Sequence, residues 1–176
     1  VKNNAENGLT ILTNILEWKS LQDNQTAEPS TVIHFNKLIE HQLEVLNYQI
    51  REKEIQVSTD LHDEYHFECD YNQLHSIIRN ILSNAVKFTP AKGHISIRNS
   101  REASMIAIEI TDNGIGMPEW IVTNIFTLRK DKQRQGTLGE NGSGIGLILT
   151  RELIESNRGS IDIKSKTGQG TTVTLR

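Results

Sequence analysis

Apolar residues recur along this chain at two spacings, which separate predicted helices from predicted strands. Apolar positions three and four residues apart are typical of helices with one buried face, and they predict helices over 9–21, 34–52, 71–88 and 145–157. Alternating apolar and polar positions predict strands at 54–61, 94–100, 104–111, 159–165 and 170–176, with 65–70 as a possible partner of the first. A short helix is expected near 118–126, because Pro118 suits a first helical turn. Helices mixed with neighbouring antiparallel strands indicate an α/β fold, a two-layer α/β sandwich.

The predicted helix over 72–88 has two distinct faces. One face is broad and apolar, formed by Leu74, Ile77, Ile78, Ile81, Leu82 and Ala85. Asn80, Asn84 and Lys87 share another face, at spacings of four and three residues. Amide oxygens can coordinate Mg²⁺, and an ammonium can pair with phosphate oxygens. A solvated polar face of an ordinary amphipathic helix is the alternative, and this helix alone does not decide between them.

Composition narrows the class of protein. The chain has 176 residues, enough for one domain with a short appendage, and 36% of them are hydrophobic. The net charge is -3 with both signs interspersed, so we expect no nucleic-acid partner. A single cysteine, Cys69, permits no disulfide within the chain and favours a reducing compartment. The apolar runs fall short of the roughly 20 residues of a membrane helix. The chain begins mid-pattern at Val1, so we expect a fragment of a longer protein.

The stretch "DNGIGM", residues 112–117, directly follows a predicted strand. Asp, Asn and Gly are the usual residues of a turn at a strand end, so the motif taken alone indicates only a turn. The other motifs of the sequence favour a ligand-binding role for this motif over a plain turn.

A glycine-rich loop, "GTLGENGSGIGL" (136–147), ends where a helix is predicted to begin. Glycines let the backbone approach a ligand closely, and a helix N-terminus suits phosphate. A flexible surface loop is the alternative. The sequence matches neither a Walker A loop nor a dinucleotide fingerprint.

Two further stretches have open interpretations. Residues 128–135 hold four cations that can fold over a polyphosphate or form a solvated charged loop: Arg129, Lys130, Lys132 and Arg134. "GQGTT" (168–172) is either a hairpin turn or a nucleotide contact. The six histidines show no metal-ligand spacing with cysteine.

The order of four motifs resembles the N, G1, G2 and G3 boxes of the sensor histidine kinase ATP-binding domain. The motifs are "NILSNAVKF", "DNGIGM", "GENGSGIGL" and "GQGTT". This domain belongs to a superfamily shared with gyrase, Hsp90 and MutL. The resemblance implies the Bergerat fold, with a mixed, mostly antiparallel sheet and helices on one face. It covers 31–176 as the catalytic domain, after a remnant of the dimerisation helix (1–22) and a linker (23–30).

The resemblance also implies roles for individual residues. Asp112 would accept a hydrogen bond from the adenine amine, and Asn84, helped by Asn80, would hold Mg²⁺. Lys87 would meet the phosphates of ATP. The remaining implied ATP contacts are Gly114, Gly116, Gly142, Gly144, Gly146, Leu147 and, in the water network around adenine, Thr171. The loop over 127–144 resembles the ATP lid of the family, and the cations at 129, 130, 132 and 134 would belong to this lid.

Two departures from the family pattern affect the expected activity. The family usually has a Phe-x-x-Phe box. Here Phe126 is followed by Thr127, Leu128 and Arg129, so Arg129 stands in place of the second Phe, which puts docking of the lid in doubt. The histidines do not match the phosphoacceptor pattern His-Glu/Asp-x-Arg-x-Pro, so the acceptor would lie outside this chain.

ATPases of the superfamily carry a general-base Glu where Asn80 stands and tend to have Asp at the position of Lys87. An amide cannot act as a base, so a kinase is favoured over a hydrolase.

The resemblance therefore implies a histidine protein kinase domain that uses ATP and Mg²⁺ to phosphorylate a histidine on a separate dimerisation domain of the same protein. A response regulator receiver domain would be an indirect partner. The full-length protein would be a membrane-associated homodimer with this domain in the cytoplasm. A degenerate nucleotide-binding regulatory module and an ATPase of the same superfamily are the alternatives.

Overall fold

The computed structural model describes residues 19, 34–62, 70–102, 105–127, 135–140 and 144–176. Apart from Lys19, the predicted N-terminal helix and the linker at 23–30 lie outside the described residues, so the proposed boundaries of the dimerisation remnant stay predictions. The predicted strand over 65–70 is likewise outside them, except for its last residue.

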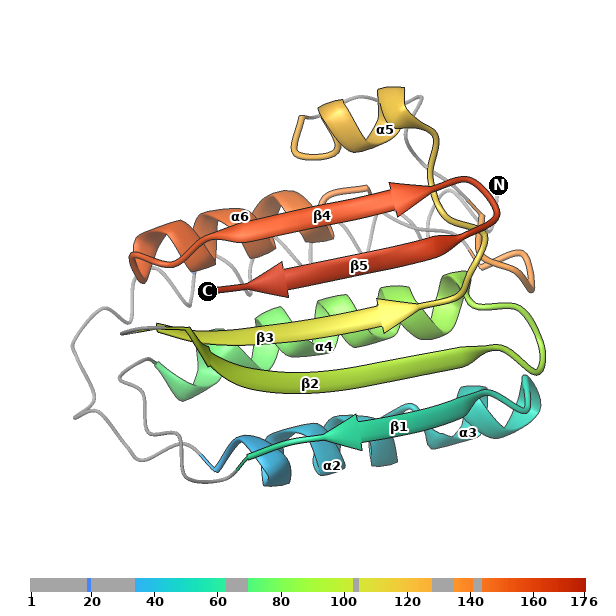
Figure 1. Cartoon of the computed structure of the whole chain (residues 1–176), viewed down its shortest axis with the longest axis horizontal. Coiled ribbons are helices and arrows are strands. Elements are labelled where there is room, and N and C mark those ends of the chain that lie inside the picture. The colour runs from blue at the N-terminus through green and yellow to red at the C-terminus, as the bar shows by residue number, and fades with distance from the viewer. Residues whose placement is uncertain (1–18, 20–33, 63–69, 103–104, 128–134, 141–143) are drawn as a thin grey trace.

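Five strands of the described chain form one mixed sheet. The strands are β1 (Gln56–Asp60), β2 (His94–Glu102), β3 (Met105–Asp112), β4 (Ile161–Lys166) and β5 (Gly170–Leu175), in the spatial order β1-β2-β3-β5-β4. β1 runs parallel to β2, and the other neighbours are antiparallel. Figure 1 shows the five strands side by side in this order.

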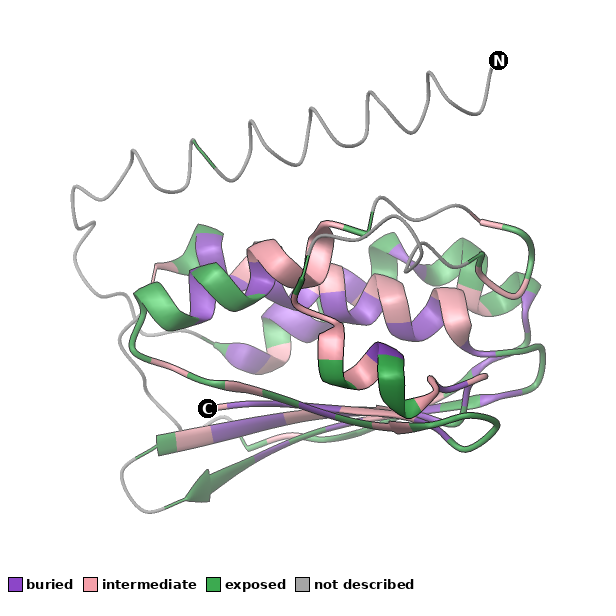
Figure 2. Ribbon diagram, turned by 90° about the horizontal axis from the view of Figure 1, so that it is seen from above, coloured by how far each residue is buried: buried purple, intermediate pink, exposed green. Residues whose placement is uncertain are grey.

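The described helices cover one face of this sheet. They are α2 (Phe35–Val45), α3 (Asn47–Glu52), α4 (Tyr71–Phe88), α5 (Glu119–Asn124) and α6 (Gly146–Ser156). Seen along its edge in Figure 2, the sheet forms one layer and the helices form the other. The predicted two-layer sandwich, with its mostly antiparallel sheet, is therefore confirmed.

The core lies between the sheet and the helices α2, α4 and α6, with α4 contributing the most buried residues. The predicted apolar face of α4 is buried throughout, and it packs against sheet residues such as Ile95, Ile97 and Ile110. Asp70 caps the helix, because Asp70 Oδ1 accepts hydrogen bonds from the N–H groups of Asn72 (2.7 Å) and Gln73 (3.0 Å). This fixes the start of α4, and with it the positions of the polar residues on its other face.

Two details differ from the prediction. The helix expected over 34–52 is divided at Leu46, which has a φ of -88° and a ψ of -1° and separates α2 from α3. Apolar spacing continues across this point, so the pattern could not reveal the division. Pro118 precedes α5 as its N-cap and is not part of its first turn.

Among the described helices, none is both long enough and apolar enough to cross a bilayer.

Candidate functional site

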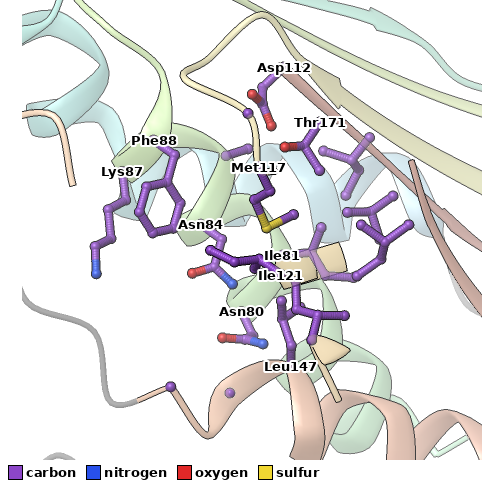
Figure 3. Close-up of a pocket in the computed structure, with 18 residues that line it drawn as sticks. Asn80, Ile81, Asn84, Lys87, Phe88, Asp112, Met117, Ile121, Leu147 and Thr171 are labelled. Atoms are coloured by element: carbon purple, nitrogen blue, oxygen red, sulfur yellow. The ribbon is translucent and has the colours of Figure 1, made fainter. Parts of the chain in front are cut away.

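A pocket of about 160 Å³ opens between α4, the ends of β3 and β5, α5 and the start of α6. Figure 3 shows Asp112 and Thr171 at one end of the pocket, and Asn80 and Leu147 at the opposite end. Met117, Ile81 and Ile121 lie between these ends and make the middle of the pocket apolar. The pocket thus combines apolar walls with a few polar groups, as small-molecule sites usually do.

Asp112 supplies a buried acceptor at one end. It is the last residue of β3, only 8% of its surface is exposed, and its Oδ1 accepts a hydrogen bond from the Gly114 N–H at 2.8 Å. Burial raises the pKa of Asp112 to about 6, although backbone hydrogen bonds from Gly114 and Thr171 oppose this shift. A carboxylate held here still has acceptor capacity for a donor on a ligand.

The glycines of "DNGIGM" are required by the backbone as well as by the pocket. A Cβ at Gly116, which has a φ of +58°, would lie 1.9 Å from the carbonyl oxygen of Lys166. A Cβ at Gly114 would lie 2.4 Å from the carbonyl oxygen of Phe88. These glycines let the loop after β3 pass between the end of α4 and the β4–β5 hairpin. The turn interpretation and the binding interpretation of this motif are therefore compatible.

Asn80, Asn84 and Lys87 all line the pocket from α4, as the helical spacing predicts. Asn80 Nδ2 donates to Thr150 Oγ1 at 2.8 Å, which ties α4 to α6 and leaves the amide oxygen on the other side of the group. Gly146 lies directly against that oxygen, because a Cβ there would be 2.4 Å from Asn80 Oδ1. Asn80 therefore both lines the pocket and positions the start of α6.

Lys87 is half-buried, and its ammonium lies 5.1 Å from the centre of the Phe88 ring. Desolvation lowers the pKa of Lys87, while the nearby charge of Glu140 raises it and that of Lys53 lowers it. A polyanion bound close to the Lys87 ammonium would keep Lys87 protonated.

The structure also brings the second and third glycine motifs to the pocket. Gly144, Gly146 and Leu147 line it at the start of α6, and Thr171 lines it from β5. Thr171 Oγ1 is 2.9 Å from Ser165 Oγ, across the β4–β5 pair. Gly142 and the four predicted lid cations, Arg129, Lys130, Lys132 and Arg134, lie outside the described residues.

Two contacts at the edges of the predicted lid had no signal in the sequence. The guanidinium of Arg151, on α6, lies 5.1 Å from the centre of the Phe126 ring. Lys53 is buried, with 2% exposure, and forms an ion pair of 2.9 Å with Glu140. Lys53 sits in the charged run "REKE", which by itself indicates an exposed helix end.

The donor set of the pocket fits Mg²⁺ bound through amide and phosphate oxygens. Among the described residues, no group of three or more His, Cys, Asp or Glu side chains could hold a metal by itself. Asn84 and Asn80 both line the pocket, and their side-chain amide oxygens are hard ligands of the kind that Mg²⁺ accepts. Mg²⁺ typically takes one or two protein oxygens and completes its shell with water and phosphate.

The sandwich, the pocket and its polar ends define an ATP-binding α/β domain. Residues 69–176 match the family described as "Histidine kinase-, DNA gyrase B-, and HSP90-like ATPase", and the chain belongs to this family. The family resemblance drawn from the four motifs is therefore confirmed.

Curated relatives of the chain include sensor histidine kinases. The chain is 31% identical over 178 residues to the circadian input-output histidine kinase CikA of Synechococcus elongatus, covering 99% of this chain and 24% of CikA. It is 29% identical over 182 residues to the sensor histidine kinase WalK of Bacillus subtilis, covering 99% of this chain and 29% of WalK. The chain thus spans less than a third of the length of these two relatives.

Solved structures show the same fold. Full-length ShkA in complex with AMPPNP has a TM-score of 0.78 at 20% identity, covering 98% of this chain and 36% of that one. The histidine kinase AdeS of Acinetobacter baumannii has a TM-score of 0.74 at 15% identity, covering 98% and 79% of the two chains.

Proposed function

We propose that this domain binds Mg-ATP in the pocket and presents the γ-phosphate to a histidine on a separate dimerisation domain of the same protein. The observation that carries the proposal is the polarity of the pocket. A buried carboxylate stands at one end, and two amides and an ammonium from one helix line one side of an otherwise mostly apolar wall.

Adenine would lie at the end formed by Asp112 and Thr171. The carboxylate of Asp112 would accept a hydrogen bond from the exocyclic amine, and the apolar walls around Met117 would contact the ring. A base without that amine would leave a buried carboxylate unpaired, which costs free energy and gives selectivity. Gly114 and Gly116 keep side chains out of this end of the pocket.

The phosphates would extend toward Asn84 and Lys87. Bound Mg²⁺ neutralises phosphate charge, and Asn84 would hold it with help from the amide oxygen of Asn80. Lys87 would pair with phosphate oxygens, and the backbone N–H groups at Gly144 and Gly146 would contact the phosphates at the start of α6. The cations at 129, 130, 132 and 134 would close over the nucleotide, and Gly142 would contact it. The domain's contribution to catalysis would be orientation and charge neutralisation.

Phosphoryl transfer is favoured over hydrolysis by the chemistry of Asn80. Its amide has no basic lone pair for water activation, and its Nδ2 already donates to Thr150. The similarity to CikA and WalK supports the same choice. The domain would act in the cytoplasm as part of a homodimeric, membrane-associated sensor that passes phosphate on to a receiver domain.

Isothermal titration of the chain with Mg-ATP tests the binding step. Asp112→Ala should abolish measurable binding and Asn84→Ala should weaken it at least about tenfold, an order-of-magnitude expectation for a lost charge-bearing or metal contact. Glu109→Gln, on the solvent face of β3, is the matched control and should leave the Kd unchanged. An Asp112→Ala variant that binds Mg-ATP as tightly as the parent would contradict the proposal.

Incubation with γ-labelled ATP tests the transfer step. The chain alone should remain unlabelled, and adding a dimerisation domain that carries the acceptor histidine should give acid-labile label on that domain. Steady phosphate release without any phosphohistidine would indicate an ATPase and exclude the kinase.

A further inference from the structure

Lys53 lies at the end of α3, outside the segment that matches the family, yet its side chain reaches the C-terminal end of α4. Its ammonium donates to the carbonyl oxygens of Val86 and Lys87, each at 2.9 Å. The last four carbonyls of a helix have no partner within the helix, and a cation there is favourable. Lys53 therefore caps the helix turn that carries Lys87.

The same ammonium also holds the loop that leads into α6. It lies 2.7 Å from Thr137 Oγ1 and 2.9 Å from Glu140 Oε1. The other oxygen of Glu140 accepts a hydrogen bond from the Leu138 N–H at 2.8 Å. One oxygen of the Glu140 carboxylate therefore pairs with Lys53, and the other accepts a hydrogen bond from within its own loop.

Thr137 completes the connection between the loop and the helix. Its N–H donates to the Lys87 carbonyl at 3.0 Å, and its hydroxyl donates to the Thr89 carbonyl at 3.0 Å. Lys53 itself is fixed from both sides, because its N–H donates to the Gln49 carbonyl and its own carbonyl accepts from the Lys92 N–H at 2.7 Å. The ammonium therefore sits at the centre of a hydrogen-bonded junction between the residue after α3, the end of α4 and the loop over 135–140.

We propose that Lys53 and Glu140 are positioning residues for the nucleotide, which hold the root of the predicted lid against the last turn of α4 and so set the place of Lys87 relative to the phosphates. The proposal rests on the proposed function, because it assigns these residues to the phosphate end of the same pocket. Neither residue is among those that line the pocket around Asp112, so we expect the effect on the phosphate tail and not on adenine.

Mg-ATP and adenosine titrations of Lys53→Met, Glu140→Gln and Thr137→Val test the proposal. The first two variants change the net charge in opposite directions. If only long-range electrostatics mattered, Lys53→Met would weaken Mg-ATP binding and Glu140→Gln would strengthen it. If the junction positions Lys87, both should weaken Mg-ATP binding, by about tenfold, while adenosine affinity stays within about twofold of the parent.

Glu109→Gln is the matched control for Glu140→Gln, because Glu109 pairs with Arg98 at 2.8 Å on the sheet, away from the pocket. It should change neither affinity. Opposite effects of Lys53→Met and Glu140→Gln on Mg-ATP, or equal losses for adenosine and Mg-ATP, would overturn the proposal. Lys53→Met leaves buried acceptors unpaired and can fail to fold, in which case Glu140→Gln and the uncharged Thr137→Val decide it.

Amide hydrogen exchange separates a failure of this proposal from a failure of the proposed function. The Leu138 and Thr137 amides should exchange at least about tenfold faster in Glu140→Gln than in the parent, with no change in the core of α4. A parent chain that binds no Mg-ATP would refute the proposed function and the nucleotide role of Lys53. Unchanged exchange would instead refute the junction itself, whatever the parent binds.

Discussion

Asp112 of β3 lies directly opposite Thr171 of β5, and this antiparallel pair forms one end of the pocket. The two residues come from motifs separated by more than fifty positions in the sequence. A backbone hydrogen bond from Thr171 partly offsets the burial that raises the pKa of Asp112 to about 6. The protonation state of this carboxyl therefore gives direct tests of the site.

The stability of the unliganded domain should depend on the charge of Asp112. The pKa of this group is raised in the folded state from 3.8 to about 6, so the folded chain binds the proton more tightly than the unfolded chain. The contribution of protonated Asp112 to the free energy of unfolding is fully present below about pH 3.8 and is lost as the pH rises through about 6. Urea unfolding of the parent and of Asp112→Asn between pH 4 and 8 gives the free energy of unfolding at each pH. The two proteins should differ in how steeply this free energy changes with pH. Parallel curves would contradict the assigned pKa.

Adenosine affinity should show the opposite dependence on pH. The ionised carboxylate is the better acceptor for the adenine amine, so binding should weaken as the pH falls through about 6, approaching tenfold per unit below it. Adenosine is the appropriate probe because it lacks phosphates that titrate. Asp112→Asn keeps an acceptor oxygen without a titrating group and should give a flat profile in the same calorimetric titration.

Gly116→Ala should destabilise the domain by about 2 kcal/mol or more, because strain at positive φ adds to a clash with backbone. The new Cβ would meet the Lys166 carbonyl, which cannot move without disturbing the end of β4. Gly168→Ala is the control, since Gly168 has a φ of +74° but a Cβ there would meet no neighbouring group within 4 Å. Denaturant unfolding should give a clearly smaller loss for the control; equal losses would show that strain alone accounts for the effect.

Thr150→Val should weaken Mg-ATP binding without changing the shape of the core. The substitution removes the acceptor that orients Asn80, whose Nδ2 donates to Thr150 Oγ1 at 2.8 Å. A double-mutant cycle with Asn80→Ala should give a coupling of about 1 kcal/mol in the binding free energy. Thr172→Val, which removes a hydroxyl contact with Thr111 on the sheet, serves as the control and should show no coupling with Asn80→Ala.

Asp70→Ala should cost about 1 kcal/mol of stability, because two N–H groups at the start of α4 lose their acceptor. The Kd for Mg-ATP should change little, since Asp70 lies at the opposite end of α4 from Lys87. Thermal unfolding and calorimetry on the same variant check both statements. A large loss of affinity with unchanged stability would contradict this division of roles.

Local patterns in the sequence predicted most of the secondary structure. Apolar spacing predicted α4 and its buried face, and alternation predicted the strands that now form β1 to β5. The same helical spacing predicted that Asn80, Asn84 and Lys87 share a face, because i, i+3 and i+4 positions lie together on any helix. The order of the four glycine and asparagine motifs was enough to identify the family.

The tertiary structure decided what those patterns could not. Strand alternation places Asp112 on the same face as Ile108 and Ile110, but its pKa of about 6 depends on β5 and the loop after β3, which remove it from water. The charged run around Lys53 predicts an exposed cation, and only the hydrogen bond of its ammonium to the end of α4 and its ion pair with Glu140 make it a buried cap. Sequence periodicity reports which side of one element a residue occupies, whereas desolvation and ion pairing depend on which other elements arrive there.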